Sequence, residues 1–466
     1  MYWSNFLHFY QPPTQKEVWV KRIAREAYRP ILSGLMERPR IKLTLNVNGI
    51  LLELFERYGE ADIIGALKKL LARGQIELTG SAKYHPLLPF LSEDEAIRQI
   101  KLNEDTLRKY FGEFWQPRGF FPPEMGFNLD VAKIVARMGY QWVIADELSF
   151  PSQHGMIDYS RIYTVSGLDD FCVYFRERRA SWLILSGQTG TGALLLNSVG
   201  ERVKRNEYLL TAMDGETFGH HRPGLEALLF EMHDLPDLVP VLISDLPEIF
   251  PMREAIEPEP STWALMAKDL ESKKPFSRWR DPDNEIHILQ WEMTELATSA
   301  ILKANTSNES FGRARLALDA ALHSDQYWWA SAKPWWSIEM IERGAKELLT
   351  AVQLMPGIDD GIKNRALELY TKIIFTAFEW QRTGKVDELA RSEDEDVRQR
   401  TDIGLPELPK REIKKMVSRL RGELKGVVKL EEFERAAQLR DRIRELKSYE
   451  KVSPHTKFIK EGDQEY

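Results

Sequence analysis

The sequence is poor in cysteine, since Cys172 is the single cysteine among its 466 residues. One cysteine excludes a disulfide within the chain and indicates a reducing compartment. The sequence also lacks an apolar run near the roughly 20 residues that a membrane-spanning helix needs. Its start, MYWSNFLHFYQPP, lacks the basic residues and apolar stretch of a signal peptide. These absences predict a cytoplasmic protein with no membrane partner.

A strong excess of one charge is missing as well, because the formal net charge is only -7. This balance gives no reason to expect tight binding to nucleic acid. Aromatic residues are plentiful, with 13 tryptophans and 15 tyrosines. Their rings fit either large cores or a groove whose flat apolar faces stack on sugars.

Four strand-like apolar segments end abruptly in polar or acidic residues. They are YWSNFLHFY at 2–10, QIELTG at 75–80, GFFPPE at 119–124 and YLLTAMD at 208–214. The carboxyl ends of strands in a parallel barrel converge on one rim, where catalysis takes place. The four endings therefore predict a single site assembled from distant parts of the chain.

The order of expected elements divides the chain into several parts. Strand and helix patterns alternate up to about residue 244, which is typical of a parallel sheet or barrel. Ser92, with Glu95 three positions later, predicts a helix start of the capping-box type, and Asn128 predicts another helix cap. The parts expected are an α/β barrel at 1–260, a helical domain at 261–384, a polar linker at 385–411 and a helical hairpin at 412–450.

Glu124 and Asp214 are the candidate catalytic residues of these segments. Pro122 and Pro123 stiffen the approach to Glu124, as a pre-positioned nucleophile requires. Glu124 also fits a helix-start glutamate that the helix dipole stabilises. Asp214 ends an apolar strand, where partial burial raises a carboxyl pKa and suits it to proton donation. It also fits a loop cap that closes the turn at Gly215.

Further candidates follow the same strand ends. His8 and Tyr10 share a face, because strand side chains alternate with a period of two. A second histidine at position 10 would favour a metal pair; with tyrosine there, we expect no metal and no cofactor. A lone strand histidine also fits a hydrogen-bonded core residue. The candidate substrate-binding residues are His8, Tyr10, Gln11, Glu77, His85, His220, Asp325 and Trp328.

The stretch HSDQYWWASAKPWW at 323–336 holds five aromatic rings among small polar residues. It fits an amphipathic helix packed on the barrel. It also fits a sugar-binding wall in which Asp325 bonds hydroxyl groups.

Five segments of the chain resemble, in order and rough spacing, the conserved regions of glycoside hydrolase family 57. They are HFYQPP at 8–13, GQIELTG at 74–80, GFFPPEMGF at 119–127, LLTAMDGETFG at 209–219 and ALHSDQYWWAS at 321–331. The resemblance extends over about 1–380. It implies an incomplete (β/α)7 barrel, followed by a helical domain that completes the cleft.

The resemblance also implies a function and roles for individual residues. The family acts on α-glucans with retention, as amylases, glucanotransferases and branching enzymes. By position, Glu124 resembles the nucleophile and Asp214 the general acid/base, while His8, Glu77 and Asp325 resemble sugar-binding residues. The expected substrate is therefore an α-glucan or maltooligosaccharide.

Two positions depart from the family pattern. The first region usually has histidine where this chain has Tyr10. The fifth region usually reads Tyr-Trp-His-Gly, whereas this chain reads YWWA at 327–330, with Trp329 in place of histidine. Both changes remove an imidazole from the sugar-binding region and leave the two carboxyl groups intact, so they bear on substrate preference.

The C-terminal segment at 416–447 resembles the UVR motif of nucleotide excision repair proteins and some stress-response proteins. The matching core is FERAAQLRD at 433–441. The resemblance implies a helical hairpin used for protein–protein contact, and we expect a protein partner through 412–450. Alternatively, the hairpin packs on its own barrel. Its basic residues alternate with acidic ones, which argues against phosphate binding.

Two further functions stay open from the sequence. The barrel can bind glucan without turning it over, while the hairpin recruits a partner. A metal-dependent carbohydrate deacetylase or zinc mannosidase-like enzyme is a third possibility, but it needs clustered His and Asp ligands.

Overall fold

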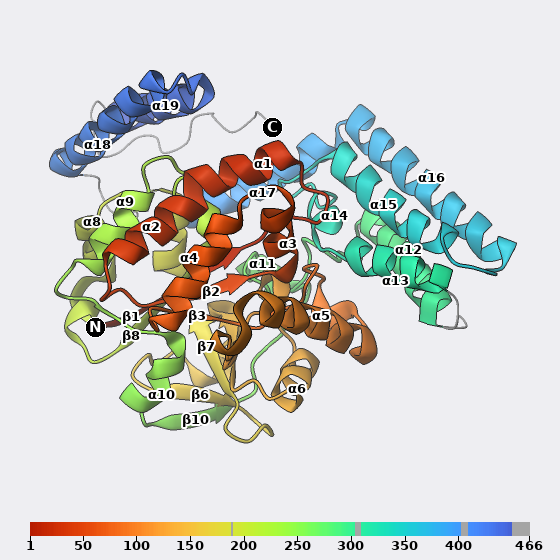
Figure 1. The fold of residues 1–466 in the computed structure, drawn as a ribbon, viewed down its shortest axis with the longest axis horizontal. Helices are drawn as coiled ribbons and strands as arrows, with labels where there is room; N and C mark the ends of the chain where they lie inside the picture. Colours follow the sequence, from red (N-terminus) through yellow and green to blue (C-terminus); the bar gives the residue numbers. More distant parts are fainter. Residues whose placement is uncertain (188–189, 303–308, 402–408, 450–466) are drawn as a thin grey trace.

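The computed structural model describes residues 1–187, 190–302, 309–401 and 409–449. These residues form a mixed α/β part, a helical part and a C-terminal hairpin (Figure 1). The strands are β1 Tyr2–Phe9, β2 Leu43–Val47, β3 Ile76–Leu78, β4 Gly119–Phe120, β5 Trp142–Asp146, β6 Ile162–Val165, β7 Cys172–Arg176, β8 Tyr208–Asp214, β9 Val239–Pro240 and β10 Arg253–Ile256.

Helices cover the α/β part and make up the rest of the described chain. In the α/β part they are α1 Glu17–Ile23, α2 Arg29–Glu37, α3 Gly49–Arg57, α4 Ala61–Ala72, α5 Glu93–Phe111, α6 Leu129–Arg137, α7 Arg178–Leu185, α8 Gly192–Val199, α9 Glu226–His233 and α10 Leu246–Ile249. Beyond it they are α11 Ala267–Glu271, α12 Glu285–Leu302, α13 Glu309–Ala321, α14 Asp325–Trp328, α15 Ile338–Gln353, α16 Asp360–Thr383, α17 Lys385–Thr401, α18 Lys410–Lys429 and α19 Phe433–Tyr449.

The first sheet has the order β3-β2-β1-β8, with β9 also paired to β1. All of its strand pairs are parallel. From Trp3 onward, the side chains of β1 are buried on both faces, which explains why its sequence is apolar without interruption. The register places His8 of β1 opposite Asn46 of β2 and Asp214 of β8, so these residues share one level at the carboxyl ends of the strands.

The second sheet has the order β10-β6-β7-β5-β4 and is parallel except for the β6–β7 pair. Backbone hydrogen bonds connect it to the first sheet at two places. Beyond β3, the Gly80 nitrogen donates to the Gly119 oxygen of β4 at 2.8 Å. After β7, the Glu177 nitrogen donates to the Leu210 oxygen of β8 at 2.8 Å.

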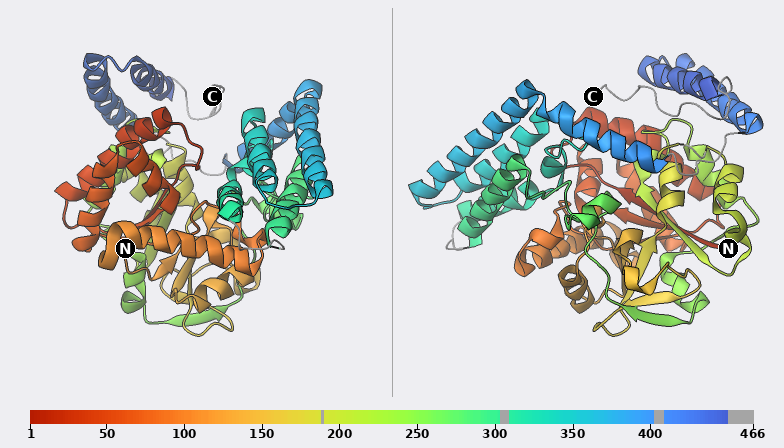
Figure 2. Two further views of the ribbon diagram at one scale, coloured as in Figure 1. Left: turned by 45° about the vertical axis from the view of Figure 1, so that its right-hand side comes forward. Right: turned by 180° about the vertical axis from the view of Figure 1, so that it is seen from behind.

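The helical part has its own core between α12, α13, α15 and α16, and it lies beside the α/β part (Figure 2). Ser92 caps α5 as predicted, since its hydroxyl accepts from the Glu95 nitrogen at 3.4 Å, but the predicted capping box is incomplete because the Glu95 carboxylate pairs elsewhere. The Glu95 side chain pairs with Arg315 of α13, with Oε1 and Nη1 2.7 Å apart. Asp319 of α13 accepts from Arg98 of α5 at 2.8 Å, so buried ion pairs join the two parts.

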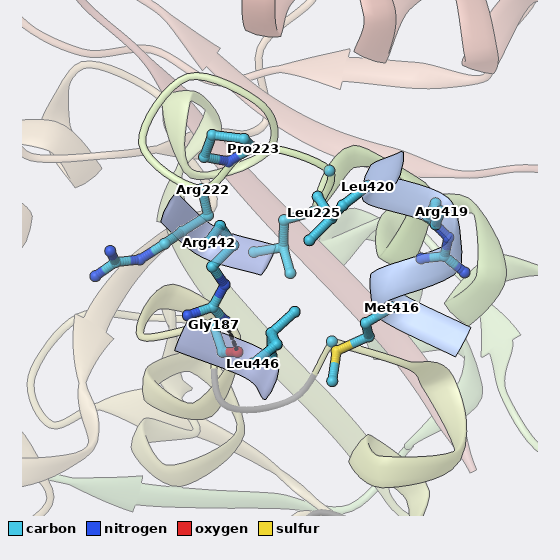
Figure 3. A pocket seen from close by; sticks show the side chains of 11 residues that line it. Gly187, Arg222, Pro223, Leu225, Met416, Arg419, Leu420, Arg442 and Leu446 are labelled. Carbon is cyan, nitrogen blue, oxygen red and sulfur yellow. Dashed lines mark hydrogen bonds between the residues drawn. The ribbon is translucent and has the colours of Figure 1, made fainter. Parts of the chain in front are cut away.

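The C-terminal hairpin consists of α18 and α19 and packs on the α/β part (Figure 3). Its Met416 and Leu420 approach Gly190 and Gly224 closely enough that an added Cβ at either glycine would clash. Its Arg442 donates to the Gly187 oxygen at 2.7 Å. The hairpin thus contacts its own α/β part, one of the two arrangements that the sequence left open.

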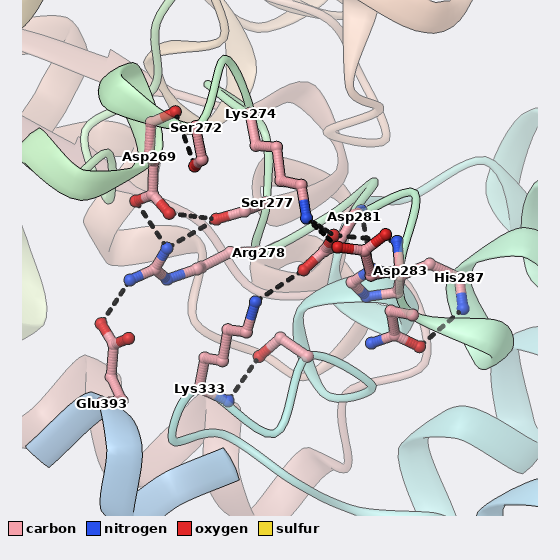
Figure 4. Close-up of polar contacts among 12 residues, drawn as sticks. Asp269, Ser272, Lys274, Ser277, Arg278, Asp281, Asp283, His287, Lys333 and Glu393 are labelled. Atoms are coloured by element: carbon pink, nitrogen blue, oxygen red, sulfur yellow. Dashed lines mark hydrogen bonds and ion pairs between the residues drawn. The ribbon is translucent and has the colours of Figure 1, made fainter.

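The segment 385–411, predicted as a linker, contains the helix α17. Lysine, glutamate, arginine and alanine favour helix, and a polar stretch of this composition need not be a linker. Glu393 of α17 is buried and accepts from Arg278 and from Lys268 (Figure 4). Arg278 in turn donates to Asp269 at 2.7 Å, so ion pairs tie α17 to the chain between α11 and α12.

No described helix is long and apolar enough to cross a membrane.

Candidate active site

Glu124 lies just beyond β4, where the chain stops being a strand and turns sharply. Its φ of 59° and the 51° of Met125 fall in the left-handed region, which non-glycine residues adopt at a cost of roughly 1–3 kcal/mol. Such strain persists only where the surroundings fix it, and it concentrates at functional sites. The predicted strand GFFPPE is therefore a two-residue strand followed by a turn that aims the Glu124 carboxyl.

Both carboxyl oxygens of Glu124 accept hydrogen bonds from residues beyond the α/β part. The Ser324 hydroxyl donates to Oε1 at 2.8 Å, and the Trp263 indole nitrogen donates to Oε2 at 2.9 Å. The Nδ1 of His85 lies 3.6 Å from Oε1. This carboxyl group is held in a fixed orientation with little exposure to solvent.

Asp214 ends β8 and is positioned by its strand. In the pairing of β1 with β8, Asp214 lies opposite His8. The next residue, Gly215, has no room for a side chain, because an added Cβ would lie 2.1 Å from the Phe9 ring. No side-chain or backbone donor in the described residues bonds the Asp214 carboxyl. Its proton can therefore exchange with a bound molecule.

The electrostatics link Glu124 and Asp214. Burial raises the pKa of Glu124 to about 8, assisted by the charges of Asp325 and Asp214 and opposed by its hydrogen bonds. Burial also raises the pKa of Asp214 to about 6, opposed by the charge of Arg176. Because like charges close together cannot both ionise freely, the pair carries one proton near neutral pH, and these values place that proton mainly on Glu124.

Three stacked rings, those of His8, His85 and Tyr10, lie beside these carboxyl groups. The His8 and His85 rings have centroids 4.9 Å apart, and the Tyr10 ring stacks on His85 at 4.1 Å. The Tyr10 hydroxyl donates to Asp325 Oδ2 at 2.7 Å. His8 bonds Asn46 at 2.7 Å, and burial lowers the pKa of His8 to about 4, so it is neutral. The structure brings these predicted residues to the two carboxyl groups.

Gln11 lies at the edge of this group. Its Nε2 donates at 3.0 Å to Glu216, which follows Asp214 by two residues. Tyr28 also donates to the same Glu216 oxygen. Burial and the nearby charge of Asp214 together raise the pKa of Glu216 to about 8. Gln11 thus acts on the site through a third buried carboxyl group.

Three other predicted residues lie apart from this group. Glu77 is opposite Thr44, two residues before the level of His8 and Asn46, and its Oε1 accepts from the Thr44 hydroxyl at 2.7 Å. His220 bonds Glu26 at 2.6 Å, on the side facing the hairpin. Trp328 stacks between Trp279 and Trp335 in an aromatic cluster of the helical part.

Sequence reasoning missed several residues that the structure places at Glu124 and Asp325. Ser324 lies inside one of the five segments noted for their family resemblance and Trp263 lies outside them, and neither residue type by itself indicates a role. His323 bonds Asp325, and its other nitrogen bonds Glu347 of α15. The adjacency of His323 to Asp325 in the sequence was the available signal.

Metal ligands do not gather in the described part of the chain. No group of three or more His, Cys, Asp or Glu side chains there is arranged to hold a metal ion. The deacetylase and mannosidase alternative needs such a ligand set.

Most glycosidases use two Asp or Glu carboxyl groups that flank the scissile bond, and Glu124 and Asp214 are two largely enclosed carboxyl groups at strand ends of this site. The chain belongs to glycosyl hydrolase family 57, whose family model matches residues 7–244, just over half of the sequence. The UvrB/uvrC motif matches 414–449, which are α18 and α19.

Named relatives include an α-amylase and a 4-α-glucanotransferase. The α-amylase of Pyrococcus horikoshii is 28% identical over 246 residues, which cover 52% of this chain and 38% of the relative. The 4-α-glucanotransferase of Thermococcus litoralis is 28% identical over 135 residues, 29% of this chain and 20% of the relative. The chain thus spans well under half the length of these curated relatives.

Solved structures support the fold. A branching enzyme of family 57 from Pyrococcus horikoshii superposes with a TM-score of 0.62 at 16% identity, covering 81% of this chain and 96% of that one. The 4-α-glucanotransferase structure from Thermococcus litoralis gives a TM-score of 0.60 at 17% identity, covering 75% and 60%.

Proposed function

We propose that this protein is a retaining enzyme on α-glucans, with Glu124 as nucleophile and Asp214 as general acid/base. The arrangement of the two carboxyl groups carries the proposal: Glu124 is clamped through both oxygens, whereas Asp214 has a free proton position. The names of the relatives, α-amylase and 4-α-glucanotransferase, support the substrate class.

The reaction consists of two displacements at the anomeric carbon. A Glu124 oxygen forms a bond to this carbon while the glycosidic bond breaks and Asp214 gives its proton to the leaving oxygen. Asp214 then takes a proton from water or from a sugar hydroxyl, whose oxygen attacks the same carbon and releases Glu124. Water as acceptor gives hydrolysis, and a sugar hydroxyl gives transfer.

The proposed sugar-binding residues are His8, Tyr10, His85 and Asp325, which surround Glu124. Stacked rings offer apolar area and polar edges, and the Asp325 carboxylate can accept from sugar hydroxyls. Gln11 supports Glu216 beside Asp214. Glu77, His220 and Trp328 make their contacts with other partners, so we give them no direct role in the proposal.

We also infer that the two sheets form the incomplete (β/α)7 barrel expected from the family. The backbone bonds of Gly80 to Gly119 and of Glu177 to Leu210 support a closed path through β1, β2, β3, β4, β5, β7 and β8. The cytoplasmic location, expected from the single cysteine, remains a prediction.

A protein partner for the hairpin at 412–450 is a further part of the proposal. The turn between α18 and α19 exposes Val428, Leu430 and Phe433, the last two by 70% and 66%. If the chain binds glucan without turnover, it would act as a regulatory protein, and this exposed apolar surface would bind the recruited partner. Cross-linking of the hairpin to a partner, lost in Phe433→Ser, checks this part.

Product analysis after incubation with maltooligosaccharides and amylose tests the proposed activity. Smaller sugars alone mean hydrolysis, a ladder of longer sugars means transfer, and α-1,6 branches mean branching. Glu124→Gln and Asp214→Asn should abolish products without lowering the melting temperature, while the exposed Glu113→Gln should act as wild type. Turnover retained in both site variants would contradict the assignment, and binding with no product would favour the regulatory function.

A further inference from the structure

His323 is a buried histidine whose two ring nitrogens both face carboxylates. It lies between α13 and α14 and is only 1% exposed. Its Nδ1 lies 3.0 Å from Asp325 Oδ2, and its Nε2 lies 3.0 Å from Glu347 Oε2. No role follows for His323 or Glu347 from the two-displacement reaction itself.

The two contacts define the protonation of His323. An ionised carboxylate only accepts hydrogen bonds, so each ring nitrogen has to donate, and the ring is then an imidazolium. Burial alone would lower the pKa of His323, but the hydrogen bonds to Asp325 and Glu347 raise it to about 10. His85, which faces the same segment from the α/β part, is neutral because burial holds its pKa well below the usual value.

The imidazolium determines how Asp325 is presented. Asp325 Oδ2 accepts from both His323 Nδ1 and the Tyr10 hydroxyl. Its Oδ1 has no protein donor among the described residues, and the side chain is 20% exposed. Burial would raise the pKa of Asp325, but the hydrogen bond from His323 holds it below the usual value. Asp325 is therefore a carboxylate with one occupied oxygen and one open oxygen.

We propose that His323, held by Glu347, is a positioning residue that fixes Asp325 as a carboxylate with Oδ1 open to a sugar hydroxyl. The inference rests on the proposed function, since Asp325 is assigned there to sugar binding. The backbone couples the same segment to the nucleophile, because Ser324, which donates to Glu124, lies between His323 and Asp325.

Glu347→Gln is the variant that tests this inference. The amide keeps the shape of the side chain and can donate to Nε2, so the ring becomes neutral and the contact survives. Glu342→Gln is the matched control, because Glu342 lies on the same helix α15 and bonds the Tyr370 hydroxyl, away from His323. His323→Gln removes the ring altogether and serves as a second variant.

Nitrogen NMR of the imidazole and substrate kinetics give separate readouts. In wild type, both ring nitrogens of His323 should stay protonated up to about pH 9. In Glu347→Gln, the ring should lose a proton near neutral pH, and KM for maltooligosaccharides should rise about tenfold while kcat changes less. Glu342→Gln should change neither readout.

Several outcomes would overturn the inference. One is a neutral His323 ring at pH 7 in wild type; another is a Glu347→Gln enzyme with the KM of the control. If wild type turns over no α-glucan, the proposed activity fails. The dissociation constant for maltooligosaccharide then replaces KM, and an unchanged value in Glu347→Gln overturns the positioning role.

Discussion

Glu124 and Asp214 are held in different ways, although both end apolar segments of the same α/β part. Ser324 and Trp263, which lie beyond that part in the sequence, bond the two oxygens of Glu124. Asp214 is fixed only by its strand, and its carboxyl group meets no donor in the described residues. One carboxyl group is thus oriented by two donors, and the other has no donor in the described part of the chain.

This difference matches what two displacements require of each group. A nucleophile must point at one carbon, and a misplacement of about 1 Å can cost roughly 100-fold in rate. A general acid/base has to follow a proton to a leaving oxygen and from an acceptor oxygen. A fixed orientation therefore suits Glu124 as the proposed nucleophile, and a carboxyl group without fixed donors suits Asp214 as the proposed acid/base.

Changing the length of each side chain gives the largest expected effect on the comparison. Glu124→Asp should lower kcat/KM by about 100-fold or more, because the shortened carboxylate cannot keep both donors and reach the substrate. Asp214→Glu should lower it by only about tenfold, because no donor in the described residues fixes the orientation of that carboxyl group. Steady-state kinetics on a maltooligosaccharide measures both values.

Melting temperatures are the control, since either variant that unfolds tells nothing about orientation. Equal losses in the two folded variants, or a larger loss for Asp214→Glu, would contradict the prediction that Glu124 needs the stricter orientation.

The pH dependence of kcat/KM is the next test, because the pair must carry one proton to react. Below about pH 6 both carboxyl groups are protonated, so no ionised nucleophile is present. Above about pH 8 both are ionised, so no group can donate a proton to the leaving oxygen. We expect a bell with limbs near these values, each falling about tenfold per pH unit. The limbs belong to the pair rather than to single residues.

Asp214→Asn sharpens the pH test. With a substrate whose leaving group needs no proton, the alkaline limb should disappear in this variant. A profile that is flat between pH 5 and 9 in wild type would mean that these carboxyl groups do not carry the reaction.

Ser324→Ala removes one of the two donors to Glu124. A hydrogen bond to a charged group contributes about 1.5–3 kcal/mol, so kcat/KM should fall about tenfold or somewhat more. Ser331→Ala is the matched control, since the Ser331 hydroxyl contacts only backbone atoms of the same segment. Equal activity of the two variants would show that Trp263 alone suffices to hold Glu124.

Much of the site could be predicted because strand endings leave a clear pattern. An apolar run that stops at an acidic residue revealed Glu124 and Asp214, and the two-residue period placed Tyr10 beside His8. The same pattern does not show how far along its strand a residue lies relative to residues on the neighbouring strands. Glu77 follows a similar run, but the strand register places it two residues below His8.

Other features had no sequence pattern at all. Ser324 and Trp263 reach Glu124 from 200 and 139 residues away, and a single polar or aromatic residue has no periodic signal. In the segment 385–411, the helix-favouring residues of α17 could be read from the sequence, but the ion pairs by which Glu393 anchors it could not. Long-range partners decided each of these cases.

The smallest expected effect concerns the loop after Asp214, which the hairpin contacts. Arg435 of α19 is 5% exposed and donates to the Gly219 oxygen, while its other nitrogen bonds Glu423 at 2.9 Å. Gly219 also lies close to the backbone of Glu26, because an added Cβ at Gly219 would lie 2.1 Å from the Glu26 carbonyl oxygen. The loop is thus held between the hairpin and the chain around Glu26.

Arg435→Ala should loosen this loop and leave the surroundings of Glu124 unchanged. We expect kcat to fall two- to threefold, with faster hydrogen exchange in 215–225 and in the hairpin, because a buried donor to the loop is lost. Formation of the glycosyl-enzyme with an activated substrate should keep its wild-type rate, since that step depends on the clamped carboxyl group. Arg444→Ala, an exposed change on the same helix, should alter neither measurement. A slower formation of the glycosyl-enzyme in Arg435→Ala would mean that the hairpin affects Glu124 as well as the loop after Asp214. The two carboxyl groups would then not depend on separate parts of the chain.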